Sequence, residues 1–387
     1  MATTPAPGTR IFFVDYLKAA IVTLVFVHHL AITYGASGSF YYTEPATDAV
    51  STVVLTLFTN FNQAWFLGLL FLLSGYFTPR SYERKGPGRF FRDRLVRLGI
   101  PLAIFFFVLN PVTVYLVGSL LPAAAAAQHG FTQPLTLSWQ FFLSHVGTGP
   151  LWFVELLLIF DLGYMAWRLL AGKTDADGAK ERPFPSYAKI TAFILVLAAS
   201  AYLLRIVAPI GAIDLGLPSL FDLPQYLGFF IVGLAAGRGD WLVKMPSSAA
   251  KKVSGVALLA SLTLLPLAIL GTFDASLGWG SLLGNGTPSS ALYALWDSIF
   301  AVGTSMAVVA YFRSHFNHGG RVWKWASQYF YAAYILQAPI LVFVAVMLSP
   351  VHIESLLKFL LAAVIAVPLI WATAYLARKI PFADRIL

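Results

Sequence analysis

The sequence predicts an all-α protein: a polytopic membrane bundle of about ten transmembrane helices, with both termini in the cytoplasm. Composition is the first reason, because 58% of the residues are hydrophobic and only 11% are charged, whereas about a quarter of a soluble domain is charged. Second, apolar stretches of about 20 residues, the length that crosses a bilayer, recur along the chain. Third, positive charge is confined to alternate connections between these stretches.

The first apolar stretch is too long for the core of a signal peptide and lacks a small-residue cleavage site, so we expect it to be retained. No internal repeat is evident and the connections are short, which predicts one integral-membrane domain over residues 1–387. The polar segment 173–185 is expected to be a cytoplasmic linker without a site. The predicted spans cover approximately residues 12–34, 53–78, 98–121, 150–171, 189–207, 224–242, 253–271, 291–312, 328–348 and 356–377.

The charges of the connections predict the orientation. One set, which includes the run from Arg80 to Arg97, carries Lys and Arg and is expected to face the cytoplasm. The net charge of +9 is therefore expected to face anionic headgroups and the cytosol, and nucleic-acid binding is not expected. We expect a multi-pass protein of the cell membrane that contacts membrane lipid. The alternate connections, about residues 35–52, 122–149, 208–223, 272–290 and 349–355, contain no Lys or Arg and are expected to face outward.

Three ionisable residues share one stripe of the first span. Lys18 and His29 are 11 residues apart, which places them within about 20° of the same helix face and about 16 Å apart along the axis, and Asp15 lies one turn before Lys18. Each charge in hydrocarbon costs about 3 kcal/mol on insertion scales, so we expect a function, with His29 as a general base. Two alternatives stay open. His28 and His29 serve only as helix-to-helix hydrogen-bond partners, or Asp15 and Lys18 form a structural ion pair.

A basic amphipathic run follows the second span. Arg89, Arg94 and Arg97 alternate with Phe and Leu in the segment RFFRDRLVRLGIP, a pattern that suits phosphate binding at a membrane surface. Ser74 and Gly75 lie at the end of the preceding span and are assigned to the same donor-binding region. The alternative is that the arginines anchor the chain at lipid headgroups.

Polar and aromatic side chains at depth in other spans are candidates for an acceptor pocket. The alternative for the amides is helix-to-helix hydrogen bonding. For the charged residues Glu155, Asp297 and Arg205, the alternative is that any two of them form a structural pair. The candidates are Asn62, Gln63, Trp152, Glu155, Asp297 and Gln337.

Several other chemistries lack their residues. The chain has no cysteine, which excludes disulfides, a thiolate nucleophile and a thiolate metal site. The loop histidines His145, His315, His318 and His352 have no partner at a metal-ligand spacing such as HExxH, so no metal is expected. Neither a GxxxxGK phosphate loop nor a GxSxG nucleophile elbow occurs.

Four segments in order resemble the membrane acyltransferase family 3. FVDYLKAAIVTLVFVHH resembles its first-helix signature, in which an Asp precedes an Arg or Lys separated by ten residues from a His; Lys18 and His29 fit that spacing. FLLSGYF followed by RFFRDRLVRLGIP resembles its second signature, whose paired arginines fall on Arg94 and Arg97. LWFVELL at 151–157 and YFYAAYILQAPIL at 329–341 resemble further family segments, and the likeness is greatest to stand-alone glucan-modifying members.

The resemblance implies ten-helix enzymes that transfer an acyl group from cytoplasmic acyl-CoA to a hydroxyl of a sugar or other acceptor, with the first-helix His essential. This sequence departs from the family at Lys18, where Arg is commoner, and at Gln337, where relatives often have His. We therefore expect an O-acyltransferase with His29 as base, Lys18 and Asp15 behind it, acyl-CoA as donor substrate and a hydroxyl-bearing acceptor, with a carbohydrate favoured. The alternative is a transporter of a sugar- or lipid-linked substrate that uses the buried charges as a proton relay.

Overall fold

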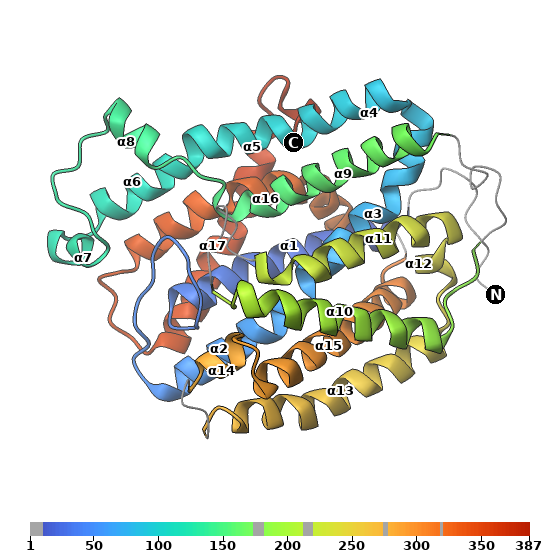
Figure 1. The fold of residues 1–387 in the computed structure, drawn as a ribbon. Helices are drawn as coiled ribbons and strands as arrows, with labels where there is room; N and C mark the ends of the chain where they lie inside the picture. Colours follow the sequence, from blue (N-terminus) through green and yellow to red (C-terminus); the bar gives the residue numbers. More distant parts are fainter. Residues whose placement is uncertain (1–10, 173–181, 212–219, 274–277, 318–319) are drawn as a thin grey trace. The chain divides into compact units, whose positions relative to one another are not determined.

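The computed structural model describes residues 11–172, 182–211, 220–273, 278–317 and 320–387 (Figure 1). Every regular element in these ranges is a helix, which confirms the all-α fold class. Contacts divide the chain into two compact units. Unit 1 comprises Met1–Leu17, Gln63–Phe91 and Ile159–Gly319, and unit 2 comprises Lys18–Asn62, Arg92–Leu158 and Gly320–Leu387. The single domain over 1–387 remains a prediction, and most of the predicted linker, together with His318, lies outside the described residues.

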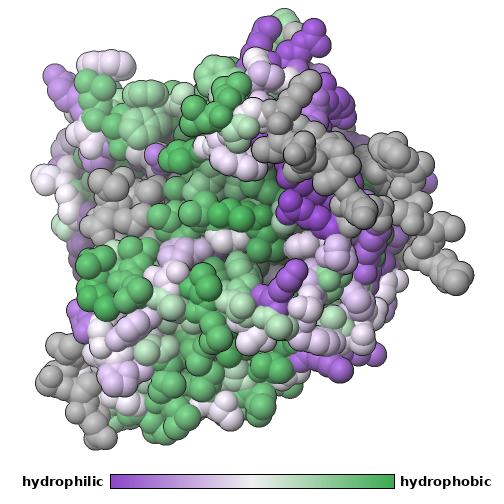
Figure 2. All heavy atoms as spheres, turned by 45° about the vertical axis from the view of Figure 1, so that its right-hand side comes forward, coloured by the Kyte–Doolittle hydropathy of each residue, from purple (hydrophilic) through white to green (hydrophobic). Residues whose placement is uncertain are grey.

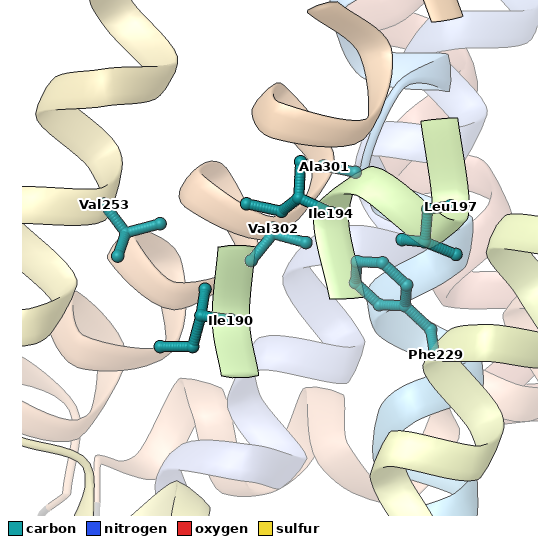
Figure 3. Packing of buried hydrophobic residues seen from close by; sticks show 7 residues of the cluster. All are labelled: Ile190, Ile194, Leu197, Phe229, Val253, Ala301 and Val302. Atoms are coloured by element: carbon teal, nitrogen blue, oxygen red, sulfur yellow. The ribbon is translucent and has the colours of Figure 1, made fainter. Parts of the chain in front are cut away.

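Unit 1 is built around the long helices that follow residue 182. In its core, Ile190, Ile194 and Leu197 project from α10 at helical spacing toward Phe229 of α11, and side chains from α13 and α15 complete the cluster (Figure 3). α3 packs mainly on α11, and α15 on both α10 and α13. The helices of unit 1 are α3 (Phe66–Lys85), α10 (Tyr187–Val207), α11 (Leu223–Gly239), α12 (Trp241–Lys244), α13 (Ser247–Leu270), α14 (Gly280–Leu283) and α15 (Pro288–His315).

Unit 2 contains the N-terminal and C-terminal spans. α16 is its central helix, because it packs on both α6 and α17. Four helices contribute residues to both units: α1 (Phe12–Thr33), α2 (Ala49–Gln63), of which only Gln63 belongs to unit 1, α4 (Pro87–Arg94) and α9 (Trp152–Ala171). The other helices of unit 2 are α5 (Ile100–Ile104), α6 (Asn110–Leu120), α7 (Ala123–Gln128), α8 (Trp139–Ser144), α16 (Arg321–Met347) and α17 (Ser355–Ala377), with π-helical turns at Leu95–Gly99 and Phe105–Leu109.

Seven helical stretches of the described residues are long and apolar enough to cross a membrane, as expected for a multi-pass membrane protein. Hydrophobic side chains accordingly cover much of the face in Figure 2. α9 carries three charged side chains and α11 has only 17 residues, so neither is among the seven. The ten spans and the orientation of the termini remain predictions. The seven are Phe12–Thr33, Ala49–Leu120, Tyr187–Val207, Ser247–Leu270, Pro288–His315, Arg321–Met347 and Ser355–Ala377.

The stretch Ala49–Leu120 contains two predicted spans, and neither is one regular helix. The first is broken by a turn at residues 64–65, between α2 and α3. The second contains the end of the first π-helical turn and all of the second, and a proline lies two residues after the end of each turn. Because Pro101 has no N–H to donate four residues back, the Arg97 carbonyl needs another partner. The Tyr331 hydroxyl supplies it, donating to that carbonyl at 2.6 Å.

A seam of glycines joins α3 to α11 in unit 1. A Cβ added to Gly75 would lie 2.3 Å from the Phe230 carbonyl oxygen, and one added to Gly237 would lie 2.2 Å from the Tyr76 oxygen. Gly233, four residues before Gly237, approaches α3 as closely. This GxxxG spacing is typical of membrane helices whose backbones touch.

Candidate active site

His29 is held by the side chain of Gln337, 308 residues later in the sequence. The imidazole Nδ1 lies 3.1 Å from Gln337 Oε1, so in the neutral tautomer that matches this contact Nδ1–H donates to the amide oxygen and Nε2 keeps its lone pair. Gln337 is completely buried, and its own Nε2 has no hydrogen-bond partner among the described residues. The structure thus brings together two of the sequence-predicted site residues and leaves the lone pair of His29 Nε2 outside this contact.

Phe40 covers one face of the His29 ring. The two rings stack with centroids 4.6 Å apart and planes 16° from parallel. Phe40 reaches this position because the chain reverses directly after α1, where Gly35 has a φ of 121° that other residues rarely adopt. The Glu44 N–H then donates to the Thr33 carbonyl at 2.7 Å and ties the returning loop to the end of α1. Phe40 could not be predicted from the sequence, because a periodic pattern does not indicate how a loop folds back.

Unit 2 also contains an ion pair between a buried lysine and a partly buried carboxylate that was not predicted from the sequence. Lys358 Nζ lies 2.6 Å from Glu44 Oε2, with the lysine side chain 5% exposed. The Tyr42 hydroxyl donates to the other Glu44 oxygen at 2.8 Å, and Lys358 stands over the Tyr34 ring. A sequence signal existed, because Lys358 is a lone cation at the end of the last span that is predicted to face outward.

Ser51 links the starts of α2 and α17. Its hydroxyl lies 2.6 Å from Asp48 Oδ2 and 2.6 Å from Glu354 Oε1. Both carboxylates also cap their helices, Asp48 by accepting from the Ser51 N–H and Glu354 by accepting from the Leu357 N–H. The hydrogen bonds from Ser51 lower the pKa of Asp48 and the pKa of Glu354 below the usual carboxyl values.

Lys18 and Asp15 lie on α1 with His29, and all three are partly buried. The rise of about 16 Å between Lys18 and His29 exceeds the reach of a lysine side chain. Lys18 therefore does not hold the imidazole directly, and Gln337 takes that position. His28 is buried and packs edge-on against the His29 ring. The catalytic roles of Lys18 and Asp15 remain predictions.

The three donor-region arginines lie on the helical run formed by α4 and the first π-helical turn. Arg89 and Arg97 are exposed and Arg94 is partly buried. Arg97 Nε is 3.6 Å from Asp93 Oδ1 one turn earlier, a contact that leaves its side chain 62% exposed. The wider π-helical turn around Arg97 is typical of functional positions, and it could not be predicted from the hydrophobic pattern.

Ser74 and Gly75 make packing contacts within unit 1. The Ser74 hydroxyl donates to the Leu70 carbonyl one turn back at 2.9 Å. Gly75 belongs to the seam with α11 described above. Their assignment to the donor region therefore remains a prediction. The helix hydrogen bond of Ser74 and the close contact of Gly75 with α11 already explain why these residue types occur here.

Trp152 and Glu155 lie at the start of α9, beside α16. The Tyr334 hydroxyl donates to the Pro150 carbonyl just before α9, and the Thr148 side chain hydrogen-bonds the Glu155 carboxyl. Tyr334 is three residues before Gln337, so a single helix contacts both the His29 side chain and the start of α9. Trp152 itself is buried.

Two neighbouring amides of α2 have different surroundings. In unit 2, Asn62 is buried and its Nδ2 lacks a hydrogen-bond partner among the described residues. In unit 1, Gln63 Nε2 donates to Asp222 Oδ2 at 3.1 Å. Gln63 thereby joins an ionic cluster in which Asp222 is already paired with Arg205.

That ionic cluster is centred on Arg205, which is 1% exposed. Arg205 Nη2 lies 2.9 Å from Asp222 Oδ1 and 2.6 Å from Asp297 Oδ2, and its guanidinium stands over the Tyr293 ring. The structural pairing that sequence analysis left open for Arg205 and Asp297 is therefore present. The acceptor-pocket role of Asp297 remains a prediction beside this pairing.

Nearly the whole chain matches a known protein family. The family described as "Acyltransferase domain", the membrane acyltransferase family 3, matches residues 11–375. The chain belongs to this family. The family is one of acyltransferases, and the helices of the described residues match a multi-pass membrane location.

Two similar relatives are both named glucans biosynthesis protein C. The protein from Escherichia coli (strain K12) is 25% identical over 158 residues, or 40% of this chain and 38% of the relative. The protein from Salmonella heidelberg (strain SL476) is 26% identical over 251 residues, or 61% of this chain and 60% of the relative. The chain thus spans less than two thirds of either relative. No solved structure matches the chain.

Proposed function

We propose that this acyltransferase moves an acyl group from acyl-CoA to a hydroxyl of a carbohydrate or similar small acceptor, with His29 as general base. The observation that carries the proposal is the contact of His29 Nδ1 with Gln337 Oε1 at 3.1 Å. It fixes the imidazole so that Nε2 is available, which is the state that a general base requires.

In the proposed reaction, His29 Nε2 takes the proton of the acceptor hydroxyl as its oxygen attacks the thioester carbonyl. The C–S bond then breaks, the acyl group stays on the acceptor oxygen, and the proton returns to the coenzyme A thiolate. General-base assistance of this kind contributes about 10²–10⁴ in rate. Direct transfer requires no nucleophile from the protein, and the chain has no cysteine to form a thioester intermediate.

Two buried amide groups of unit 2 support a polar acceptor. Asn62 Nδ2 and Gln337 Nε2 are buried and have no partner within the described ranges. A buried donor without a partner costs about 1–3 kcal/mol, and a sugar hydroxyl is the kind of acceptor that would relieve this cost. We assign both to the acceptor pocket, together with Trp152 and Glu155 of the same unit.

The donor phosphates are proposed to bind Arg89, Arg94 and Arg97. Exposed guanidinium groups make bidentate hydrogen bonds to phosphate, and Arg97 remains exposed beside Asp93. Replacing Arg94 and Arg97 by Gln should raise the KM for acyl-CoA more than it lowers kcat. An unchanged donor affinity would remove the phosphate role and leave the lipid-anchoring alternative.

The decisive assay is transfer of radiolabelled acyl groups from acyl-CoA to a glucan acceptor by the purified protein. We expect His29→Ala to lose about 10²–10⁴ of the activity. His28→Gln is the matched control, because it changes the adjacent buried imidazole. Retained activity in His29→Ala would exclude His29 as the base, and transfer in detergent, where no gradient exists, would separate this enzyme from the transporter alternative.

The proposal includes ten spans with both termini in the cytoplasm. Its support is that each of the ten predicted spans coincides with helix in the described residues. Because the chain has no cysteine, single cysteines report sidedness cleanly. Thr136→Cys should react with an impermeant maleimide in intact cells and Ser248→Cys should react only after lysis; the opposite pattern would reverse the orientation.

A further inference from the structure

Unit 1 contains a cavity of about 260 Å³ that the proposed reaction does not use. Its walls come from α3, α10, α11 and α15, and none of the lining residues is among the predicted donor or acceptor residues. Ile190, Phe229 and Val302 belong both to this lining and to the packed cluster in Figure 3. The cavity is therefore bounded on one side by the well-packed core of unit 1.

The lining extends along the helices and is apolar for most of its length. It runs from Phe229 to Ala236 on α11 and from Val302 to Val309 on α15, which at 1.5 Å per residue is about 10 Å in each case. Ser305 contributes one hydroxyl. A cavity with so few polar groups offers a sugar or a nucleotide no adequate set of hydrogen bonds.

One end of the cavity carries a positive charge. Lys189, in the first turn of α10, is exposed and belongs to the lining. Phe184 and Trp241 line the same end, and the Trp241 indole N–H donates to the Arg182 carbonyl at 2.9 Å. Tryptophan and lysine near the end of a membrane helix are typical of the headgroup level of a bilayer.

We infer that this cavity binds one acyl chain of an anionic phospholipid, with the lipid phosphate at Lys189. The elongated apolar walls suit a hydrocarbon chain, and the cation at one end complements a phosphate, which is the arrangement of charge along such a lipid. The surrounding helices already face lipid, since Leu195 and Val196 on α10 are 54% and 63% exposed. The inference is independent of the role of His29.

The test uses the full-length protein in phosphatidylcholine vesicles that contain phosphatidylglycerol with a photoreactive diazirine in one acyl chain. In the wild type, crosslinks should map to peptides of α10, α11 and α15 that line the cavity. Val232→Trp fills the cavity from a partly buried position, so labelling of these peptides should fall to background. Ile231→Trp is the matched control, because Ile231 is 54% exposed and does not line the cavity; it should label like the wild type.

A second comparison tests the charge. Lys189→Gln should reduce labelling by the phosphatidylglycerol probe about fivefold, the effect of one cation near a headgroup, and should leave labelling by a phosphatidylcholine probe unchanged. Lys252→Gln, at another exposed lysine that lies over the Tyr187 ring, is the control.

Three results would overturn the inference: equal labelling of wild type and Val232→Trp, equal phosphatidylglycerol labelling of wild type and Lys189→Gln, or displacement of the probe by acyl-CoA, which would indicate a donor site instead. Each variant is first checked for a monodisperse elution profile. If Val232→Trp does not fold, Met306→Trp fills the cavity from the opposite wall, α15.

Discussion

Replacing Gln337 by Leu tests whether this residue positions His29. The substitution keeps an apolar side chain of similar size but removes the oxygen that lies 3.1 Å from His29 Nδ1. A hydrogen bond between neutral groups contributes about 0.5–1.5 kcal/mol net, and a tenfold change corresponds to about 1.4 kcal/mol. We therefore expect kcat to fall about fivefold, within limits of about 2-fold and 13-fold, while the KM for the donor stays unchanged.

The assay is acyl transfer by purified protein, with kcat and KM measured separately for Gln337→Leu, His29→Ala and a control. Gln225→Leu is a suitable control, because Gln225 is also a buried membrane glutamine, and it makes one hydrogen bond, at 2.8 Å to the Ala64 carbonyl. Both glutamine variants should lose similar thermal stability, but only Gln337→Leu should lose kcat.

Two results would refute the positioning role. A kcat within measurement error of the wild type would mean that the contact with Gln337 does not orient the base. A loss as large as that of His29→Ala would mean that Gln337 itself contacts the reacting groups, since one neutral hydrogen bond is too weak to account for 10² or more.

The remaining predictions concern stability. Lys358→Met should destabilise the protein by about 1–3 kcal/mol in thermal unfolding, since it leaves the partly buried Glu44 carboxylate without its cation; adding Glu44→Gln should restore much of the loss, and no recovery would mean that the pair is not coupled. The carboxylates that Ser51 contacts have lowered pKa values, so their contribution is present at neutral pH and lost as the pH falls below about 4; melting curves of Ser51→Ala should therefore change less on acidification than those of the wild type. Gly75→Ala should destabilise by about 1–3 kcal/mol without changing the KM for the donor, whereas a raised KM at unchanged stability would support a donor-binding role instead.

The helices were predictable because their signal is local. A span of about 20 apolar residues is determined by the thickness of the bilayer, and each predicted span coincides with helix in the described residues. The irregular points were not predictable. The turn between α2 and α3 lies inside a predicted span, and the π-helical turn at Arg97 lies at the start of the next one. Hydropathy carries no information on backbone hydrogen-bond register.

The site was predictable residue by residue but not as an arrangement. Helical spacing selected His29, and its depth in a span marked it as functional. Its partner Gln337 was assigned to the acceptor pocket instead, because a contact across 308 residues depends on how α16 packs. Lys358 was missed for a related reason: a charge at the end of a span resembles a loop charge until its partner Glu44 is located.

The glycine seam between α3 and α11 has a mechanical consequence. With no side chains between the two backbones, neither a lipid tail nor a water molecule fits into the gap at Gly75, Gly233 and Gly237. Sliding one helix along the other would drive carbonyl oxygens into α-carbons within a fraction of a turn. The two helices therefore move as one rigid body. Any rearrangement of unit 1 during a catalytic cycle has to occur at its other helix contacts.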